Sequence, residues 1–222
     1  MLTFYCEKCI IWSVNKTGII SAILRYYAKI FRRKEVIRTM KWMIASDIHG
    51  SAHFCGELLN AYKSENADRL LLLGDILYHG PRNNLPYGYD PKKTAEMLND
   101  MKADIVCVRG NCDAEVDLMV LGFPIVPVCS LILDDGINVF ASHGHIYNID
   151  NPPPQPTGGI LLYGHTHVPL CEKRSEHIFL NPGSVSIPKE ASPHSYMTYE
   201  NGTFLWKDLS GNIYNEFSFT NA

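Results

Sequence analysis

Short apolar runs alternate with helix-like stretches in the part of the chain that follows residue 40. Between the runs, residues 51–64 place apolar side chains three and four positions apart, and residues 91–101 begin with a proline that suits a first helical turn. Apolar runs this short are typical of buried strands, which are predicted at 42–45, 69–73 and 104–108. This order of strand, helix, strand, helix, strand predicts a parallel sheet of an α/β fold.

The second half of the chain consists of strand-like runs separated by turns. Asp134-Asp135-Gly136 and Asn201-Gly202 have the composition of tight hairpin turns. We therefore expect the two halves to contribute one sheet each to a sandwich. The predicted strands of this half are 126–133, 137–142, 160–163, 169–172, 178–181, 196–199 and 203–208.

Side chains that bind metals follow several of these apolar runs, each beside a glycine. Because the carboxyl ends of parallel strands meet at one edge, we expect Asp47, Asp75 and Asn111 to lie together. Oxygen and imidazole donors without thiolate suit Mn²⁺, Fe²⁺ or Zn²⁺ better than Ca²⁺, and Ni²⁺ is a further candidate. The stretches concerned are Asp47-Ile48-His49-Gly50, Gly74-Asp75, Gly110-Asn111-Cys112-Asp113, His143-Gly144-His145 and Gly164-His165-Thr166-His167.

A pair of adjacent metal ions needs a bridging carboxylate, and Asp75 is the natural candidate. Such a pair binds phosphate oxygens, lowers the pKa of a bridging water and stabilises the charge of in-line attack, so no protein nucleophile is required. Histidines two residues apart on an extended segment face the same side. This spacing favours a shared partner for His165 and His167, but it does not distinguish His143 from His145.

Composition and charge narrow the range of functions. The 222 residues are 46% hydrophobic and 19% charged, as in an ordinary globular domain, and a net charge of −3 argues against broad attraction to nucleic acid or anionic membranes. Seven irregularly spaced cysteines do not form a secreted disulfide framework, which favours a cytoplasmic location. No transmembrane segment is expected, the expected partner is a small molecule, and a homo-oligomer is left open.

Residues 1–39 differ from the rest and are expected to be an N-terminal extension to a domain at 40–222. Residues 19–31 carry apolar side chains at helical spacing, and Arg32-Arg33-Lys34 follows them. One interpretation is an amphipathic helix that rests on a membrane surface or a partner. The other, which we favour, is a dispensable extension.

In their order along the chain, these motifs resemble those of the calcineurin-like metallophosphoesterases, and most closely the small bacterial YfcE-type phosphodiesterases. Residues 74–83 and 181–188 add to this resemblance, and the second stretch is expected to be a structural turn beside the site. The resemblance implies an α/β fold, a four-layer αββα sandwich of two mixed β-sheets flanked by helices. It also implies two divalent ions, with Mn²⁺ the first candidate: Asp47, His49 and His167 would hold one, Asn111, His143 and His165 the other, and Asp75 would bridge them.

The implied activity is a metal-dependent phosphodiesterase that acts on a small phosphodiester. The wider family usually has a histidine where this chain has Cys112, so the identity of the general acid is open, and a preference for good leaving groups is expected. Asp113 either orients the site or caps the following helix. In the irregular loop 79–89, His79 and Arg82 are candidates for substrate contact, with loop anchoring as the alternative for Arg82. His145 is expected beside the metal ligands or facing the substrate.

Three competing functions share this fold. A noncatalytic binding scaffold resembling the retromer subunit is the alternative from a different class, but in a scaffold the metal ligands would be free to disappear. A nuclease would need a basic groove, which the net charge does not predict. A phosphomonoesterase is the third alternative, and comparing diester and monoester hydrolysis separates it from the first interpretation.

Overall fold

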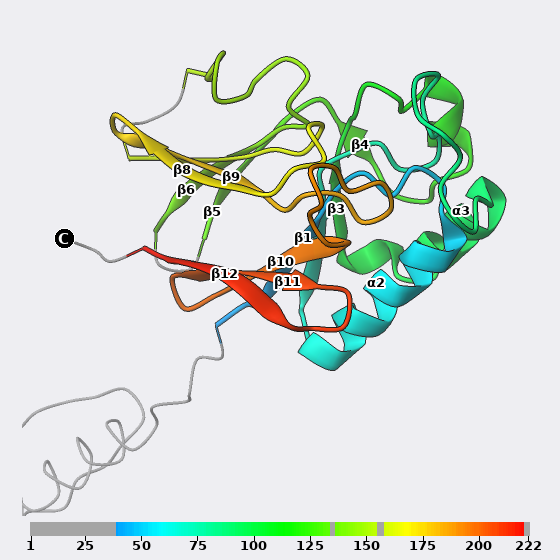
Figure 1. Cartoon of the computed structure of the whole chain (residues 1–222), viewed down its shortest axis with the longest axis horizontal. Coiled ribbons are helices and arrows are strands. Elements are labelled where there is room, and N and C mark those ends of the chain that lie inside the picture. Colours follow the sequence, from blue (N-terminus) through cyan, green and yellow to red (C-terminus); the bar gives the residue numbers. More distant parts are fainter. Residues whose placement is uncertain (1–38, 134–135, 155–157, 220–222) are drawn as a thin grey trace, which may run out of the picture. The chain divides into compact units, whose positions relative to one another are not determined.

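The computed structural model describes residues 39–133, 136–154 and 158–219 (Figure 1). The predicted extension therefore lies outside the described residues, apart from Thr39, and both of its interpretations stay predictions. No helix within the described ranges has the length and apolar character needed to cross a bilayer.

A seven-stranded mixed sheet contains the predicted parallel strands. β1 (Trp42–Ala45), β2 (Arg69–Leu72) and β3 (Ile105–Val108) run parallel in sequence order, as predicted. A short fourth parallel strand that was not predicted, β4 (Ile125–Val126), forms the edge beside β3. On the other side of β1 lie three antiparallel strands, β10 (Ser195–Glu200), β11 (Thr203–Asp208) and β12 (Ile213–Ser218). The prediction of one sheet from each half is therefore wrong, because the C-terminal strands complete the first sheet.

The second sheet has five strands in the order β5-β6-β7-β9-β8. Three central strands run parallel, and the outer two are antiparallel to their neighbours. This sheet is also mixed, so the predicted pair of mixed sheets is confirmed. Its strands are β5 (Cys129–Ile132), β6 (Asn138–Ala141), β7 (Ile160–Leu162), β8 (Leu170–Arg174) and β9 (His177–Asn181).

The predicted strand 126–133 is divided between the two sheets. Val126 pairs with Val108 in the first sheet, whereas Cys129 pairs with Ala141 in the second. Pro127 lies between them, and a proline cannot donate the backbone hydrogen bond that a continuous strand requires. The chain therefore changes sheets at this point.

Two helices cover the outer face of the seven-stranded sheet (Figure 1). Helix α2 (Ala52–Glu65) begins after Ser51, whose side chain accepts a hydrogen bond from the Phe54 N–H, and helix α3 (Pro91–Asn99) begins with a proline after the capping residue Asp90. Their buried side chains pack with those of β1 and β2. Two short 3₁₀ helices complete the described helices, η1 (Lys102–Asp104) and η2 (Glu115–Met119).

Two further apolar layers hold the second sheet. Between the sheets, a core that includes Leu71, Leu162 and Trp206 joins β2, β7 and β11. On the outer face of the five-stranded sheet, Phe179 and its neighbours pack with Ile149 of the loop that follows β6. Within the described residues, a loop therefore covers the face where the expected four-layer fold would have a helix.

Candidate metal centre

The predicted metal ligands follow strands of both sheets. Asp47, Asp75 and Asn111 come shortly after β1, β2 and β3, at the carboxyl ends of parallel strands. His143 follows β6, and His165 and His167 follow β7. Each sheet thus supplies part of the cluster. The cluster lies at the carboxyl ends of the strands, where α/β sheets usually bind their ligands.

One group of donors consists of Asp47, His49 and His167. The His167 Nε2 and His49 Nε2 atoms lie 3.3 and 3.5 Å from Asp47 Oδ1, and 3.3 Å from each other. All three side chains are buried, and one ligand atom from each lies within 4.8 Å of the others. These three atoms therefore surround a single point from which a cation could contact all of them.

A second group surrounds His143. Its Nε2 atom lies 3.3 Å from Asp75 Oδ2, 3.0 Å from Asn111 Oδ1 and 3.3 Å from His165 Nδ1. The same Asp75 oxygen lies 3.7 Å from His49 Nε2, a member of the first group. The carboxylate of Asp75 thus stands between the two groups, where a bridging ligand would be.

Three backbone carbonyls determine which ring nitrogen of these histidines carries the proton. The Nδ1 atoms of His49, His143 and His167 lie 2.7, 2.7 and 2.6 Å from carbonyl oxygens of Tyr78, Leu73 and Ile187, respectively. A carbonyl only accepts, so each Nδ1–H donates and each neutral ring turns the lone pair of Nε2 toward the cluster. This arrangement is typical of histidines that bind metals.

Two further observations show that the donors fit a divalent cation. Asp47 Oδ1 is buried and has no hydrogen-bond partner in the structure, although a buried polar atom of this kind almost always has one. The Nε2 lone pairs of His49 and His167 face each other at 3.3 Å. One divalent metal ion could bind Asp47 Oδ1 and both Nε2 atoms at once. Carboxylate oxygen together with imidazole nitrogen is a donor set that suits Mn²⁺, Fe²⁺ and Zn²⁺.

The electrostatics of the cluster keep its carboxylates ionised. Burial alone would raise the pKa of Asp47, but the adjacent imidazoles of His167 and His49 outweigh it and hold that pKa well below its usual range. At Asp75, burial likewise raises the pKa, but His143 lowers it by more, so the pKa of Asp75 lies below its usual value. Burial lowers the pKa of His143, but the two carboxylates overcome this and raise it to about 9. The cluster thus attracts positive charge, whether it comes from protons or metal ions.

Five of the seven predicted ligands have a left-handed backbone. The φ angles of Asp47, His49, Asp75, His165 and His167 are 59°, 49°, 55°, 67° and 62°. This conformation costs a non-glycine residue about 1–2 kcal/mol, and such strained residues tend to cluster at active sites and ligand clamps. The sharp turns at the strand ends thus point several side chains at one place, at the expense of stability.

Asp113, predicted as catalytic or capping, has a positioning role in the structure. Its carboxylate accepts hydrogen bonds from the backbone N–H groups of Asp75, Ile76 and Gly110, at 2.9, 2.8 and 2.7 Å. The backbone N–H of Ala114, which precedes the following 3₁₀ helix, is instead bound by Asp117. Asp113 therefore joins the turns after β2 and β3, and it does not line the pocket at the metal centre.

The stretch 181–188 holds the backbone of the ligands. Ser184 Oγ and Ser186 Oγ donate hydrogen bonds to the carbonyl of Asp47, at 2.9 and 3.1 Å. Asn181 Nδ2 donates to the carbonyl of Gly164, at 2.8 Å, just before the two histidines that follow β7. The expected structural turn is therefore present.

A pocket of about 380 Å³ opens beside the cluster. Arg82 and Cys112 line it, as expected of residues near a substrate, and so does Lys189, which no sequence motif had indicated. The only signal was the position of Lys189 directly after the 181–188 stretch. The residues that line the pocket are Asp75, Gly80, Pro81, Arg82, Asn83, Asn111, Cys112, His165, His167 and Lys189.

Two predicted substrate contacts lie outside this lining. The ring of His79 packs edge-on against Tyr78 and Tyr89, with centroids 4.7 and 5.3 Å away, because the loop folds its aromatic side chains together. His145 is exposed, with its ring centroid 5.5 Å from that of His143. His79 therefore supports the loop, while His145 stands beside the ligands as expected.

Residues 40–203 match the model of the calcineurin-like phosphoesterase superfamily domain. The chain belongs to this superfamily. It is 47% identical over 162 residues to phosphodiesterase YfcE of Escherichia coli K12, a match that covers 73% of this chain and 88% of that protein. The structure of E. coli YfcE superposes with a TM-score of 0.78 at 43% identity, over 82% of this chain and all of that one.

More distant solved structures share the fold alone. Vps29 of Entamoeba histolytica, in a structure with bound Zn²⁺, has a TM-score of 0.55 at 20% identity, covering 82% of this chain and all of that chain. The family and the mixed-sheet fold expected from the sequence are thus confirmed. The clustered aspartates and histidines make a divalent metal site part of this assignment.

Proposed function

We propose that the protein is a phosphodiesterase with two metal ions, held by the seven ligands predicted from the sequence. The observation that carries this proposal is the position of Asp75 Oδ2, which lies 3.3 Å from His143 Nε2 and 3.7 Å from His49 Nε2. The 47% identity to phosphodiesterase YfcE supports the choice of a diester as substrate. The ions, with Mn²⁺ as first candidate, would bind the phosphate and supply an activated water.

The protein itself orients the reacting groups. Backbone carbonyls fix the histidine rings, and the carboxylate of Asp113 fixes the turns that carry Asp75 and Asn111. Arg82 lines the pocket with a planar guanidinium suited to bidentate contact with a phosphate. Without bound metal ions, burial and the nearby Asp75 carboxylate raise the pKa of the Cys112 thiol to about 12, and a thiol is in any case a weaker proton donor than the histidine usual at this position. We therefore expect the enzyme to prefer substrates whose leaving groups need little protonation.

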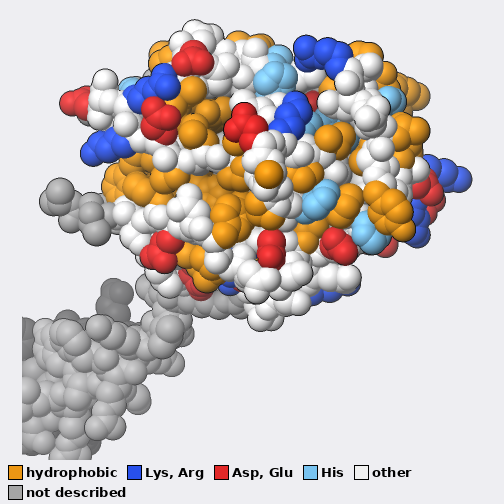
Figure 2. Space-filling model, in the orientation of Figure 1, with side chains coloured by type: hydrophobic (Ala, Val, Ile, Leu, Met, Phe, Trp, Pro, Cys, Tyr) orange, Lys and Arg blue, Asp and Glu red, His pale blue; other side chains and the backbone are white. Residues whose placement is uncertain are grey.

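The alternatives have less support. The fold alone does not separate an enzyme from a scaffold, because Vps29 proteins share it. The 47% identity to phosphodiesterase YfcE favours the enzyme. On the face shown in Figure 2, Lys and Arg side chains alternate with Asp and Glu and form no basic tract of the kind a nuclease needs.

The described cysteines form no disulfide, in line with a cytoplasmic location.

The proposal is tested with metal-stripped protein and two chromogenic substrates, bis-p-nitrophenyl phosphate and p-nitrophenyl phosphate. Mn²⁺, Mg²⁺, Zn²⁺ or Ni²⁺ is restored in turn. We expect metal-dependent hydrolysis with the diester preferred, and loss of at least about a hundredfold in rate for Asp75→Asn. A folded protein that hydrolyses neither substrate with any metal would favour the scaffold, and a preference for the monoester would favour a phosphatase.

A further inference from the structure

Arg82 and Lys189 line the pocket with no ion-pair partner among the described residues. Both side chains are exposed. By contrast, Arg69, Arg109 and Arg174 each form an ion pair with a carboxylate. Among the described arginines only Arg82 lacks such a partner, whereas several described lysines also lack one. What distinguishes Lys189 is that it lines the same pocket as Arg82, where both cations are available to a ligand.

The two cations approach the pocket from different sides. Arg82 belongs to the loop after β2, where a Cβ at Gly80 would lie 3.0 Å from Cys112 Sγ, so this loop borders the turn that carries Asn111. Lys189 donates its backbone N–H to the carbonyl of His167, at 3.1 Å. Arg82 thus stands near the second group of ligands and Lys189 near the first.

A strained turn holds the backbone of Lys189. Glu190 and Ala191 have φ angles of 54° and 56°, both in the left-handed region, which is strained for residues other than glycine. Ser192 closes the turn with its N–H and its hydroxyl, which donate to the Lys189 carbonyl at 3.0 and 2.6 Å. Neither Glu190 nor Ala191 is a predicted metal ligand. Asn66, Ser175 and Asn201 have the same conformation at turns that do not line the pocket, so what matters here is the position of the turn, which fixes the backbone of Lys189 at the wall of the pocket.

The charge of the site exceeds what a simple diester offers. Two divalent ions with the carboxylates of Asp47, Asp75 and Asp113 leave a net charge of about +1, which the single charge of a diester would offset. Arg82 and Lys189 then add two further positive charges on the wall of the pocket. A ligand with additional negative charge matches this arrangement.

We infer that the substrate is a phosphodiester whose alcohol part carries a second anionic group, a phosphate or a carboxylate, and that Lys189 binds this group. This inference rests on the phosphodiesterase activity proposed above. A pocket of about 380 Å³ accommodates a small metabolite of this kind. Lys189 would thus determine specificity at a position away from the bond that is cleaved.

The test uses the full chain loaded with Mn²⁺ and four p-nitrophenyl diesters. Their second alcohol carries a hydroxyl, a carboxylate, a phosphate or a trimethylammonium group. We expect kcat/KM to be highest for the two anionic diesters and lowest for the cationic one. In Lys189→Met, kcat/KM for the anionic diesters should fall about five- to twentyfold more than for the hydroxyl diester, mainly through KM.

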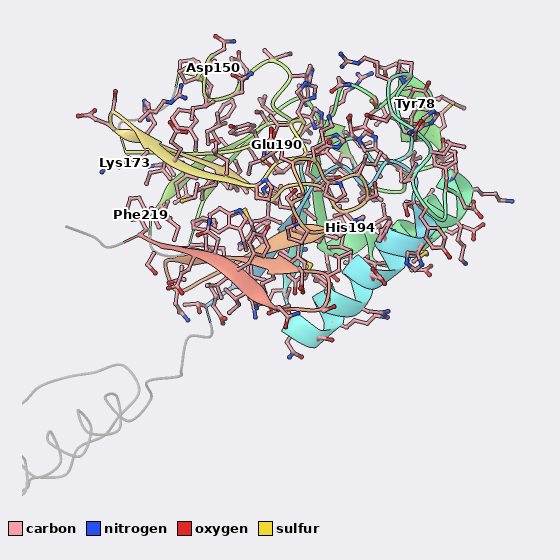
Figure 3. The ribbon with its side chains drawn as sticks, in the orientation of Figure 1. Tyr78, Asp150, Lys173, Glu190, His194 and Phe219 are labelled. Carbon is pink, nitrogen blue, oxygen red and sulfur yellow. The ribbon has the colours of Figure 1, made fainter. Side chains whose placement is uncertain are left out.

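Two variants serve as controls. Lys189→Arg should restore most of the preference, because it keeps the charge. Lys173→Met removes a lysine charge from β8 instead. In Figure 3, Lys173 is well separated from Glu190, the residue that follows Lys189, so this variant should not alter the preference. Calorimetry with the matching phosphonates, which are not hydrolysed, should show the same order of affinities without turnover.

Each outcome has a defined meaning. If wild-type protein hydrolyses no diester, the proposed activity itself fails. If it hydrolyses all four at similar kcat/KM, or if Lys189→Met lowers all four equally, only the role of Lys189 in specificity is overturned. A preference for carboxylate over phosphate, or the reverse, identifies the second group.

Discussion

The Nε2 atoms of His49 and His167 lie 3.3 Å apart at the metal centre, and each ring donates its other N–H to a backbone carbonyl. Because a carbonyl holds each proton on Nδ1, neither neutral ring can donate to the other. The contact is favourable only if a cation lies near both nitrogens. The geometry of this pair therefore leads directly to a prediction about stability.

Metal ions should stabilise the folded protein against heat. A metal at a hundred times its dissociation constant adds about 2.7 kcal/mol, which corresponds to a rise of about 5–10 °C in Tm for a domain of this size. Differential scanning calorimetry of chelated protein with and without Mn²⁺ measures this rise. Asp47→Asn should abolish most of it, whereas Asp150→Asn, at a side chain that is 84% exposed, should leave it intact. An equal rise in both variants would show that Mn²⁺ binds elsewhere.

Asp113→Ala should destabilise the protein by about 2–4 kcal/mol, because three buried backbone N–H groups lose their acceptor. Urea unfolding monitored by circular dichroism measures the change, and metal affinity should fall with it. A residue that acted as a catalytic acid would instead alter the pH dependence of kcat with little effect on stability. That second pattern would contradict the positioning role.

Gly110→Ala should remove metal binding and activity. A Cβ at this position would overlap the Asp75 carboxylate and backbone N, neither of which can move without displacing Asp75, the proposed bridging ligand. Metal content after dialysis, measured by atomic absorption, should fall well below that of the wild type. Gly56→Ala is the matched control, since its Cβ would meet only the flexible end of Met97 at 3.4 Å, and it should stabilise α2 by about 0.5–1 kcal/mol. Normal metal content in Gly110→Ala would show that the turn after β3 can shift.

Cys112→Ala should have little effect on catalysis, with kcat/KM within about threefold of the wild type for aryl diesters. A thiol is a weak proton donor near neutral pH, and the Cys112 backbone N–H, which the variant keeps, donates to Asp75 Oδ1 at 2.8 Å. The Cys112 Sγ atom accepts a hydrogen bond from Asn111 Nδ2 at 3.2 Å and lies within 4.8 Å of ligand atoms of His49 and Asp75. The measurement is a series of diesters whose leaving groups rise in pKa. A dependence on leaving-group pKa that becomes steeper in the variant would establish the thiol as the proton donor.

Protonation of Glu65 should destabilise the protein at acid pH. Burial raises the pKa of Glu65, but hydrogen bonds from Lys207, Lys41 and Tyr196 outweigh this effect and lower it. A lowered pKa in the folded state means that the stabilisation is complete above the unfolded-state pKa and is lost as the pH falls through the folded-state value. Glu65→Gln should therefore cost about 2–4 kcal/mol at pH 7 and much less near pH 3, as judged by urea unfolding.

The control for this prediction is Glu57→Gln, on the same helix. Its side chain is 45% exposed and lies 3.5 Å from His53, so the substitution should change stability by less than about 0.5 kcal/mol. A Glu65→Gln protein that lost equal stability at both pH values would show that packing, and not charge, is responsible.

The parallel strands and the residues at their ends could be predicted from the sequence, because both depend on local patterns. Uninterrupted apolar runs mark β1 to β3, and a glycine beside each ligand marks the turn that follows. The contact of His167 with Asp47 could not be derived from spacing, since it joins residues far apart in the chain. Resemblance to a known family supplied that assignment, and the structure brings the two side chains within 3.3 Å.

The assembly of the sheets could not be predicted in the same way. Strand β10 pairs with β1 across most of the domain, and no local pattern encodes that partner. Strand β12 was missed because it is an exposed edge strand, with its first four residues exposed in succession and no apolar alternation. Lys189 escaped notice for a related reason: its importance comes from a strained turn at the pocket, which no sequence pattern reveals.

The left-handed turns of the ligands are held by hydrogen bonds to neighbouring chain segments. The N–H groups of Asp47 and His49 donate to the carbonyls of Gly74 and Asp75, at 3.1 and 2.9 Å. The turns are thus fixed by the fold, so one ion can replace another without any refolding. Ions of similar size then compete by their intrinsic affinities and by their concentrations in the cell. The metal recovered with the purified protein will therefore reflect the growth medium as much as the preference of the site.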